Sequence, residues 1–273
     1  MQRAFLLRSR KGTKVSWVPL SSALLVAFCL LAAGCSSSGS SANVAEVAGN
    51  WQITLQGPIA TYSQSGFLLQ SGKSVNGQFL LSGSCAGVGT VQGQTENSSV
   101  SLTVNQPAQI INLSGAPDAN GSSLSGSYSI LTGGCGASEV GTWAAIKVAD
   151  LTGSFTGTFT SNGGTGVASH FSGTVTQGQN VGASSATLNG SMTSSDAVCF
   201  AEATVAGMIS GTSVLFNLTS PDGRLALGQF SGQMTSDASS ATGTYDFFNA
   251  QTPIPGCPHG ESGTATLAIH PAQ

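Results

Sequence analysis

The stretches Val100-Ser101-Leu102-Thr103-Val104 and Val214-Leu215-Phe216-Asn217-Leu218 both place apolar residues at every second position. Successive side chains of a strand point to opposite faces, so this alternation is typical of a strand with one buried face. Similar segments recur along the chain, separated by short runs of Gly, Asn, Asp and Ser that are typical of turns. No segment shows the period of a helix. The sequence therefore predicts an all-β protein.

The two opening stretches also belong to an internal repeat. Each follows a cysteine at the same spacing and precedes a Gly-x-Tyr element and a later glutamate. Low-complexity bias inflates the matched glycines, but it does not explain the matched cysteines and tyrosines. The matched positions include Val47-Ala48-Gly49-Asn50-Trp51 and Leu151-Thr152-Gly153-Ser154-Phe155, Cys85 and Cys199, Gly126-Ser127-Tyr128 and Gly243-Thr244-Tyr245, and Glu139 and Glu261.

Each copy holds about eight candidate strands at the spacing of roughly 8–12 residues that small barrels and sandwiches show. The connections are short, which favours antiparallel neighbours, and closing a sheet into a barrel removes its edges. We therefore expect two tandem small antiparallel β-barrels, with a β-sandwich as the alternative. The expected domains are residues 47–148 and residues 149–273.

The N-terminus, residues 1–34, has the zones of a secretory signal: basic residues, the apolar run Ala23–Ala33 and small residues up to Gly34. The run is shorter than the ~20 residues of a membrane span. Leu31-Ala32-Ala33-Gly34-Cys35 resembles the lipobox of bacterial lipoproteins, although Ala32 stands where that family usually has Leu. The alternative is an ordinary signal peptide with a chance cysteine.

The lipobox resemblance implies cleavage before Cys35 and acylation of that residue, with chains such as palmitate. Residues 35–46 then form the lipidated cysteine and a flexible Ser/Gly tether. By resemblance to enterobacterial sorting, Ser36 in place of Asp predicts the outer membrane. The expected location is the cell envelope, facing the periplasm or the cell surface.

Charge is sparse beyond residue 34. Only Lys73, Lys147 and Arg224 are basic there, against all 11 acidic residues of the chain. A surface with so few cations does not neutralise phosphates, so nucleic-acid binding is not expected.

The layout of copy one resembles small avidin- and lipocalin-like barrels. The elements that carry this likeness are Gly49-Asn50-Trp51, Ser125-Gly126-Ser127-Tyr128 and Gly141-Thr142-Trp143. Copy two departs from the pattern, with Phe155 and Ala265 at the two tryptophan positions. The resemblance implies a barrel, but it places no biotin-binding residue.

Four further cysteines lie at equivalent positions of the two copies. An exported protein permits disulfides, and the symmetry favours Cys85–Cys135 and Cys199–Cys257. A zinc site is the alternative, but no Cys-x-x-Cys pair occurs and the histidines are scattered. We expect no metal and no cofactor.

Trp51 and Trp143 are the candidate ligand-binding residues, because they occur in copy one alone and an indole suits the wall of a pocket for a small apolar ligand. If first and last strands pair, the two indoles are expected to be neighbours. The alternative is that both fill the core. Glu139 and Glu261 are carboxylates at matching positions, either structural acceptors of backbone N–H groups or ligand contacts.

No catalytic residue is assigned. The predicted function is a non-catalytic envelope lipoprotein whose β domains bind an envelope component or serve structurally. The alternative is an envelope-associated hydrolase that uses His259, Glu261 and Ser262, but residues crowded on one loop rarely form a catalytic triad. No Gly-x-Ser-x-Gly motif is present.

Overall fold

The computed structural model describes residues 44–83, 85–131, 138–163, 168–197, 199–221, 225–249 and 260–272. These residues form sixteen strands, eight from each copy of the repeat. The first eight are β1 (Gly49–Gln56), β2 (Thr61–Ser71), β3 (Ser74–Leu81), β4 (Gly87–Glu96), β5 (Ser99–Gln106), β6 (Gln109–Pro117), β7 (Ser123–Leu131) and β8 (Glu139–Val148). The second eight are β9 (Gly153–Ser161), β10 (Ala168–Gln177), β11 (Ala186–Thr193), β12 (Glu202–Ser210), β13 (Ser213–Thr219), β14 (Leu225–Met234), β15 (Ser240–Asn249) and β16 (Glu261–Pro271).

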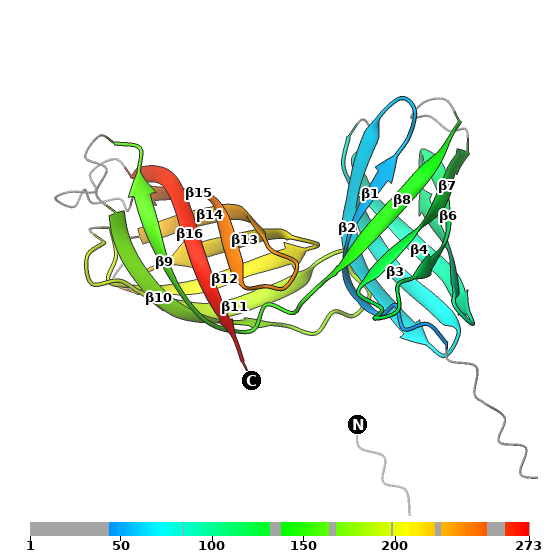
Figure 1. Ribbon diagram of the computed structural model, residues 1–273. Helices are drawn as coiled ribbons and strands as arrows, with labels where there is room; N and C mark the ends of the chain where they lie inside the picture. The colour runs from blue at the N-terminus through cyan, green and yellow to red at the C-terminus, as the bar shows by residue number, and fades with distance from the viewer. Residues whose placement is uncertain are drawn as a thin grey trace, which may run out of the picture. The chain divides into compact units, whose positions relative to one another are not determined.

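Each set of eight strands closes into an antiparallel up-and-down barrel (Figure 1). Every strand pairs with its neighbours in sequence, and closure comes from the pairing of β1 with β8 and of β16 with β9. The prediction of two tandem small barrels is confirmed. The sandwich alternative is wrong, because its two sheets would leave the first and last strands of each copy unpaired with each other.

The two opening stretches lie in β5 and β13 and alternate as expected. Val100, Leu102 and Val104 are buried in the first barrel, while Ser99 before them and Ser101 between them are exposed. The burial of β13 follows the same period of two. Inward side chains exclude water from the barrel interior, and outward hydroxyls remain solvated.

Equivalent hairpin turns join β4 to β5 and β12 to β13. Each contains one residue with a left-handed backbone, Asn97 with φ of 54° and Gly211 with φ of 56°. Glycine and asparagine are the residues that adopt this conformation most readily. The repeat therefore preserves a backbone conformation at this turn while the residue changes.

The barrels differ in how their interiors are filled. The first has a mainly aliphatic core around Trp51, Phe79 and Trp143. The core of the second contains eight aromatic rings, and those of Phe159 and Phe171 stack with centroids 4.1 Å apart.

Residues Ser40–Gln273 form one compact unit that contains both barrels. β8 ends at Val148 and β9 begins at Gly153. The Asn50 side chain donates to the Gly211 carbonyl at 2.9 Å and accepts the Gly211 N–H at 2.8 Å. Whether each barrel is an independent domain stays a prediction.

Candidate functional site

Trp51 and Trp143, the candidate ligand-binding residues, lie in the core of the first barrel. Trp51 is fully buried and Trp143 is 2% exposed. Their indole N–H groups donate to the carbonyls of Val47 at 2.8 Å and Ser114 at 3.1 Å. A buried indole whose single donor is satisfied has what a core residue requires. Both tryptophans are therefore placed as the alternative interpretation, that they fill the core, requires.

The two indoles are not neighbours, and that expectation was wrong. β1 and β8 do pair, but their register sets Trp51 opposite Lys147 and Leu55 opposite Trp143. Four residues along a strand correspond to about 13 Å. The expectation took account of the strand pairing but not of its register.

Side chains also fill the interior of the second barrel. The space left among its inward-facing rings and aliphatic side chains is about 10 Å³. That is close to the smallest cavity that holds one water molecule. Eight strands enclose a space that side chains fill or that one small ligand occupies, and here the side chains fill it.

Glu139, at the start of β8, is buried and accepts two phenolic hydroxyls. Tyr62 donates to its Oε2 at 3.0 Å and Tyr128 to its Oε1 at 3.1 Å. Gly57 approaches so closely that a Cβ there would overlap the carboxylate. The glutamate is thus seated between two tyrosines and a glycine.

Glu261 occupies the equivalent position at the start of β16. Tyr245 donates to its Oε1 at 2.6 Å, and the Cys199 Sγ atom lies 3.7 Å from its Oε2. In both barrels the tyrosine ring also packs against a glycine two residues after the glutamate, Gly141 or Gly263. The carboxylates are therefore held structurally, and the donors described for them are phenols.

These environments stabilise the neutral form of the tyrosines. Burial, and then the hydrogen bond to Glu139, raise the pKa of Tyr128 to about 12. Burial and the hydrogen bond to Glu261 raise the pKa of Tyr245 well above its usual range. The hydrogen bond to Glu139 is the main cause of the raised pKa of Tyr62. At neutral pH these phenols act as hydrogen-bond donors.

The hydrolase alternative rests on His259, Glu261 and Ser262. His259 lies outside the described residues. Glu261 and Ser262 are consecutive on β16, so their side chains point to opposite faces of the barrel wall, and Ser262 is exposed. Catalytic partners must converge on one point, which the two described members do not do.

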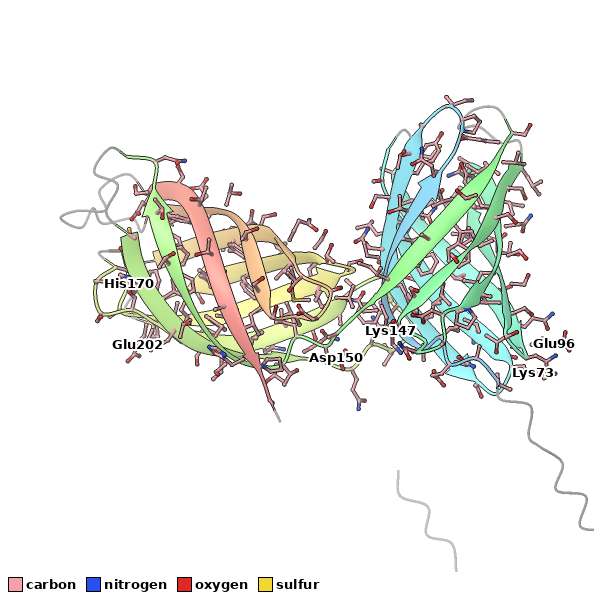
Figure 2. All side chains as sticks on the ribbon, viewed as in Figure 1. Lys73, Glu96, Lys147, Asp150, His170 and Glu202 are labelled. Atoms are coloured by element: carbon pink, nitrogen blue, oxygen red, sulfur yellow. The ribbon has the colours of Figure 1, made fainter. Side chains whose placement is uncertain are left out.

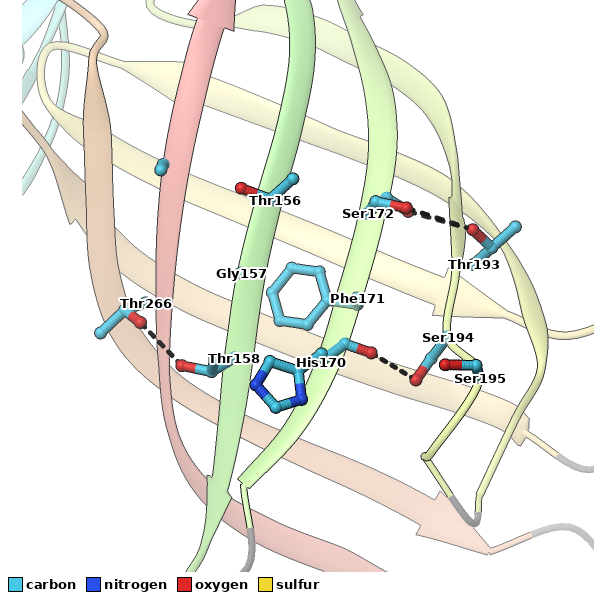
Figure 3. Close-up of a pocket in the computed structure, with 11 residues that line it drawn as sticks. Thr156, Gly157, Thr158, His170, Phe171, Ser172, Thr193, Ser194, Ser195 and Thr266 are labelled. Carbon is cyan, nitrogen blue, oxygen red and sulfur yellow. Dashed lines mark hydrogen bonds between the residues drawn. The ribbon is translucent and has the colours of Figure 1, made fainter.

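An open hollow of about 620 Å³ lies on the outer wall of the second barrel (Figure 3). β9, β10, the end of β11 and β16 contribute to it, together with the segment that follows β11. Among its eleven lining residues, His170 has the only ionisable side chain and Phe171 the only other ring. Seven lining residues carry a hydroxyl group: Thr156, Thr158, Ser172, Thr193, Ser194, Ser195 and Thr266.

Asp196 fixes His170 at the lip of this hollow. Its Oδ1 accepts the His170 backbone N–H at 2.8 Å, and its Oδ2 lies 2.9 Å from Nδ1 of the ring. The hydrogen bond to the His170 side chain is the main cause of the lowered pKa of Asp196. Ser194 donates its hydroxyl to the His170 carbonyl. The imidazole is thus oriented, with Nε2 as the ring nitrogen away from Asp196.

Sequence reasoning missed this pair. His170 and Asp196 are 26 positions apart, and neither has a matching residue in the first copy. Only the pairing of β10 with β11 brings the two segments together.

The remaining site predictions fall partly outside the described residues, which begin at 44 and so do not include Cys35. Cys85 and Cys199 are described, and neither is a free thiol. Their expected partners, Cys135 and Cys257, are not among the described residues. The pairing within each copy stays a prediction.

The described residues also bear on metal binding and on membrane-spanning helices. No group of three or more His, Cys, Asp or Glu side chains in them is placed to hold a metal ion. In the same part of the chain, no helix has the length and apolar character that crossing a bilayer requires.

Comparison with known proteins gives no family. No family model and no curated protein matches the chain. Among solved structures, a DUF3598-family protein of unknown function from Nostoc punctiforme PCC 73102 is 12% identical, with 84% of this chain and 96% of that chain covered at a TM-score of 0.24. Kievitone hydratase from Nectria haematococca is 8% identical, with 82% and 90% covered at the same TM-score. At these scores neither likeness bears on function.

Proposed function

We propose that the protein is a lipid-anchored lipoprotein of the cell envelope whose barrels bind without catalysis, through their outer walls. The anchor is Cys35, and the proposal for it rests on the lipobox-like Leu31-Ala32-Ala33-Gly34-Cys35 and the signal zones before it. Replacement of Cys35 by Ser should release the protein from the membrane fraction and abolish labelling by tagged palmitate. If Cys35→Ser stays in the membrane fraction and is still labelled by tagged palmitate, the anchor is contradicted.

The observation that carries the binding role is where the space lies. One cavity among the core side chains of the second barrel has about 10 Å³, whereas the hollow on its outer wall offers about 620 Å³. Ligand sites commonly occupy roughly 300–1,000 Å³. A ligand of this barrel therefore has room on the outer wall rather than inside.

The lining indicates the chemical class of the ligand. Hydroxyl groups both donate and accept hydrogen bonds, and the Thr158 and Thr266 hydroxyls, 2.9 Å apart, show two of them side by side. His170 adds an oriented ring nitrogen. The lining residues include no Lys or Arg to pair with a phosphate or carboxylate. An uncharged, polyhydroxylated ligand such as an envelope glycan fits best.

The test uses the compact unit Ser40–Gln273 and a neutral oligosaccharide, chitotriose. Imidazole NMR signals of His170 should shift on titration and saturate at about millimolar concentration, a weak affinity of roughly −4 kcal/mol. His170→Ala and Asp196→Asn should lose binding, as measured by calorimetry. His270→Ala is the matched control, since His270 is exposed on the same barrel but outside the hollow.

Two outcomes would refute the proposed ligand. One is an unmoved His170 signal at tens of millimolar sugar; the other is equal binding by wild type and His170→Ala. A requirement for anionic saccharides would also contradict it, because the hollow offers no Lys or Arg.

A further inference from the structure

One end of the first barrel combines exposed apolar side chains with a lack of surface charge. At this distal end β1, β3, β5 and β7 end and β2, β4, β6 and β8 begin, opposite the end where β1 begins. Six of the eight exposed large apolar side chains described in the first barrel lie here. We call them the apolar collar: Ile59, Leu80, Val88, Ile110, Leu131 and Val140.

Charge is distributed in the opposite way. Among the described residues at the distal end, 56–61, 80–83, 85–90, 104–111, 129–131 and 138–140, Glu139 is the single charged residue. It is buried and bonded to Tyr62 and Tyr128. The other five charged residues of this barrel lie at the opposite end: Glu46, Lys73, Glu96, Asp118 and Lys147. Figure 2 labels Lys73, Glu96 and Lys147 there.

The collar encircles the barrel rather than forming one patch. Leu80 and Val88 are cross-strand partners on β3 and β4. Ile110 and Leu131 are partners on β6 and β7, and Val140 follows on β8. In a closed ring of eight strands, β3 and β4 lie across from β7 and β8. A partner protein with a flat surface covers one wall of such a ring, whereas a fluid lipid layer surrounds the whole ring.

The depth of the collar also suits a lipid surface. The collar residues on the strands lie at the strand ends or one residue from them, within about 3 Å along the strand. Interfacial segments bury their apolar side chains roughly 5–10 Å into the headgroup region. The lack of surface charge removes the main cost of entering that region. A single exposed apolar side chain needs no explanation, but six at one uncharged end do.

We propose that the distal end of the first barrel docks on a lipid bilayer by inserting the apolar collar. The interaction is independent of the acyl chain at Cys35, which lies on the other side of β1 in the sequence. It needs no anionic lipid, because the distal end has no cation.

The test is flotation of the unit Ser40–Gln273 with phosphatidylcholine vesicles, so that no lipobox or acyl chain contributes. The wild type should float with the vesicles. Val140→Asp and Val88→Asp, on opposite walls, should each reduce the vesicle partition coefficient at least about tenfold. A factor of ten corresponds to about 1.4 kcal/mol, which is close to the free energy of burying one Val side chain.

The matched control is Val181→Asp, the same substitution at a side chain that is 87% exposed in the second barrel. It should float like the wild type. Unchanged far-UV circular dichroism and tryptophan emission show that a variant is folded, and Ile59→Asp in the β1–β2 connection replaces any that is not.

Three results would overturn the proposal. The first is a wild type that stays in solution, and the second is binding that requires anionic lipid. The third is a result that indicates a protein partner such as a second copy. It is seen either as loss of binding in one wall variant only, or as self-association that Val140→Asp abolishes in a protein that does not bind vesicles.

Discussion

In the first barrel, Gly115 of β6 pairs with Gly126 of β7. The Trp143 ring packs over these glycines, with Leu113 nearby on β6. The second barrel has Ala265 in place of Trp143, because each pairs with the equivalent glycine, Gly243 or Gly126. It has Phe230 in place of Leu113, because each pairs with the equivalent tyrosine, Tyr245 or Tyr128. A Cβ on Gly115 would lie 3.0 Å from the indole, and one on the equivalent Gly232 would lie 2.5 Å from the Phe230 ring.

A Leu and Trp pair has thus been exchanged for a Phe and Ala pair over the same glycines. Interiors are packed at nearly constant density, so a large side chain lost at one position must be replaced at a neighbouring one. Both copies therefore keep an aromatic ring over the equivalent glycine, Gly115 or Gly232, but the ring comes from a different strand in each copy. The Tyr–Glu pair, in contrast, is kept in both copies with its geometry.

The largest expected effect comes from removing the tryptophan. Trp143→Ala should lower the free energy of unfolding of the first barrel by ~3–5 kcal/mol, because a buried ring leaves a cavity. Adding Leu113→Phe, which recreates the pair of the second barrel, should restore part of the loss. Urea unfolding followed by circular dichroism measures both.

Leu113→Phe alone is the control and should cost about 1–3 kcal/mol through overpacking. The comparison fails if the two single effects simply add in the double variant. A cost below about 1 kcal/mol for Trp143→Ala would instead favour the wall of a pocket.

A smaller effect is expected at Gly57, where the second barrel has Ser161. Gly57→Ala should destabilise the first barrel by about 1–3 kcal/mol, because the new methyl group displaces Glu139 and breaks its bonds to the two tyrosines. Thermal unfolding measures the change. Ser161→Ala in the second barrel removes a hydroxyl that bonds Tyr245 and the Gly163 N–H, and should cost about 1 kcal/mol. An unchanged unfolding temperature of Gly57→Ala would contradict the seating of Glu139.

The smallest effect is a dependence on alkaline pH. The chain has three tyrosines, and all three have raised pKa values. A group whose pKa is higher in the folded state than in the unfolded state contributes its stability below the unfolded value, near 10, and loses it as the pH rises. For Tyr128 the loss spans pH 10 to about 12.

Absorbance at 295 nm should show no tyrosine titrating near pH 10 in the native protein. In denaturant, all three should titrate there. Tyr128→Phe should remove one of the late-titrating groups. A native tyrosine with an ordinary titration would show that its hydrogen bond to the glutamate does not form.

Some of the proposed site residues could be predicted from local sequence, and others only from the tertiary structure. The repeat pointed to Glu139 and Glu261 because a carboxylate kept between two copies is visible in one sequence. Nothing local identified His170 with Asp196, since neither is repeated and strand pairing alone unites them. The apolar collar was equally hidden, because its members are single apolar residues on different strands.

By itself, the sequence determined the strands, their number in each copy, the repeat and the carboxylates held in it. These depend on a period of two and on matching spacings, which are local properties of the chain. Only the tertiary structure decided that the sheets close, that Trp51 and Trp143 are separated along the β1–β8 pair, and that the apolar collar gathers at one end. Closure and register depend on which hydrogen bonds form between strands about a hundred residues apart, and no local pattern specifies those.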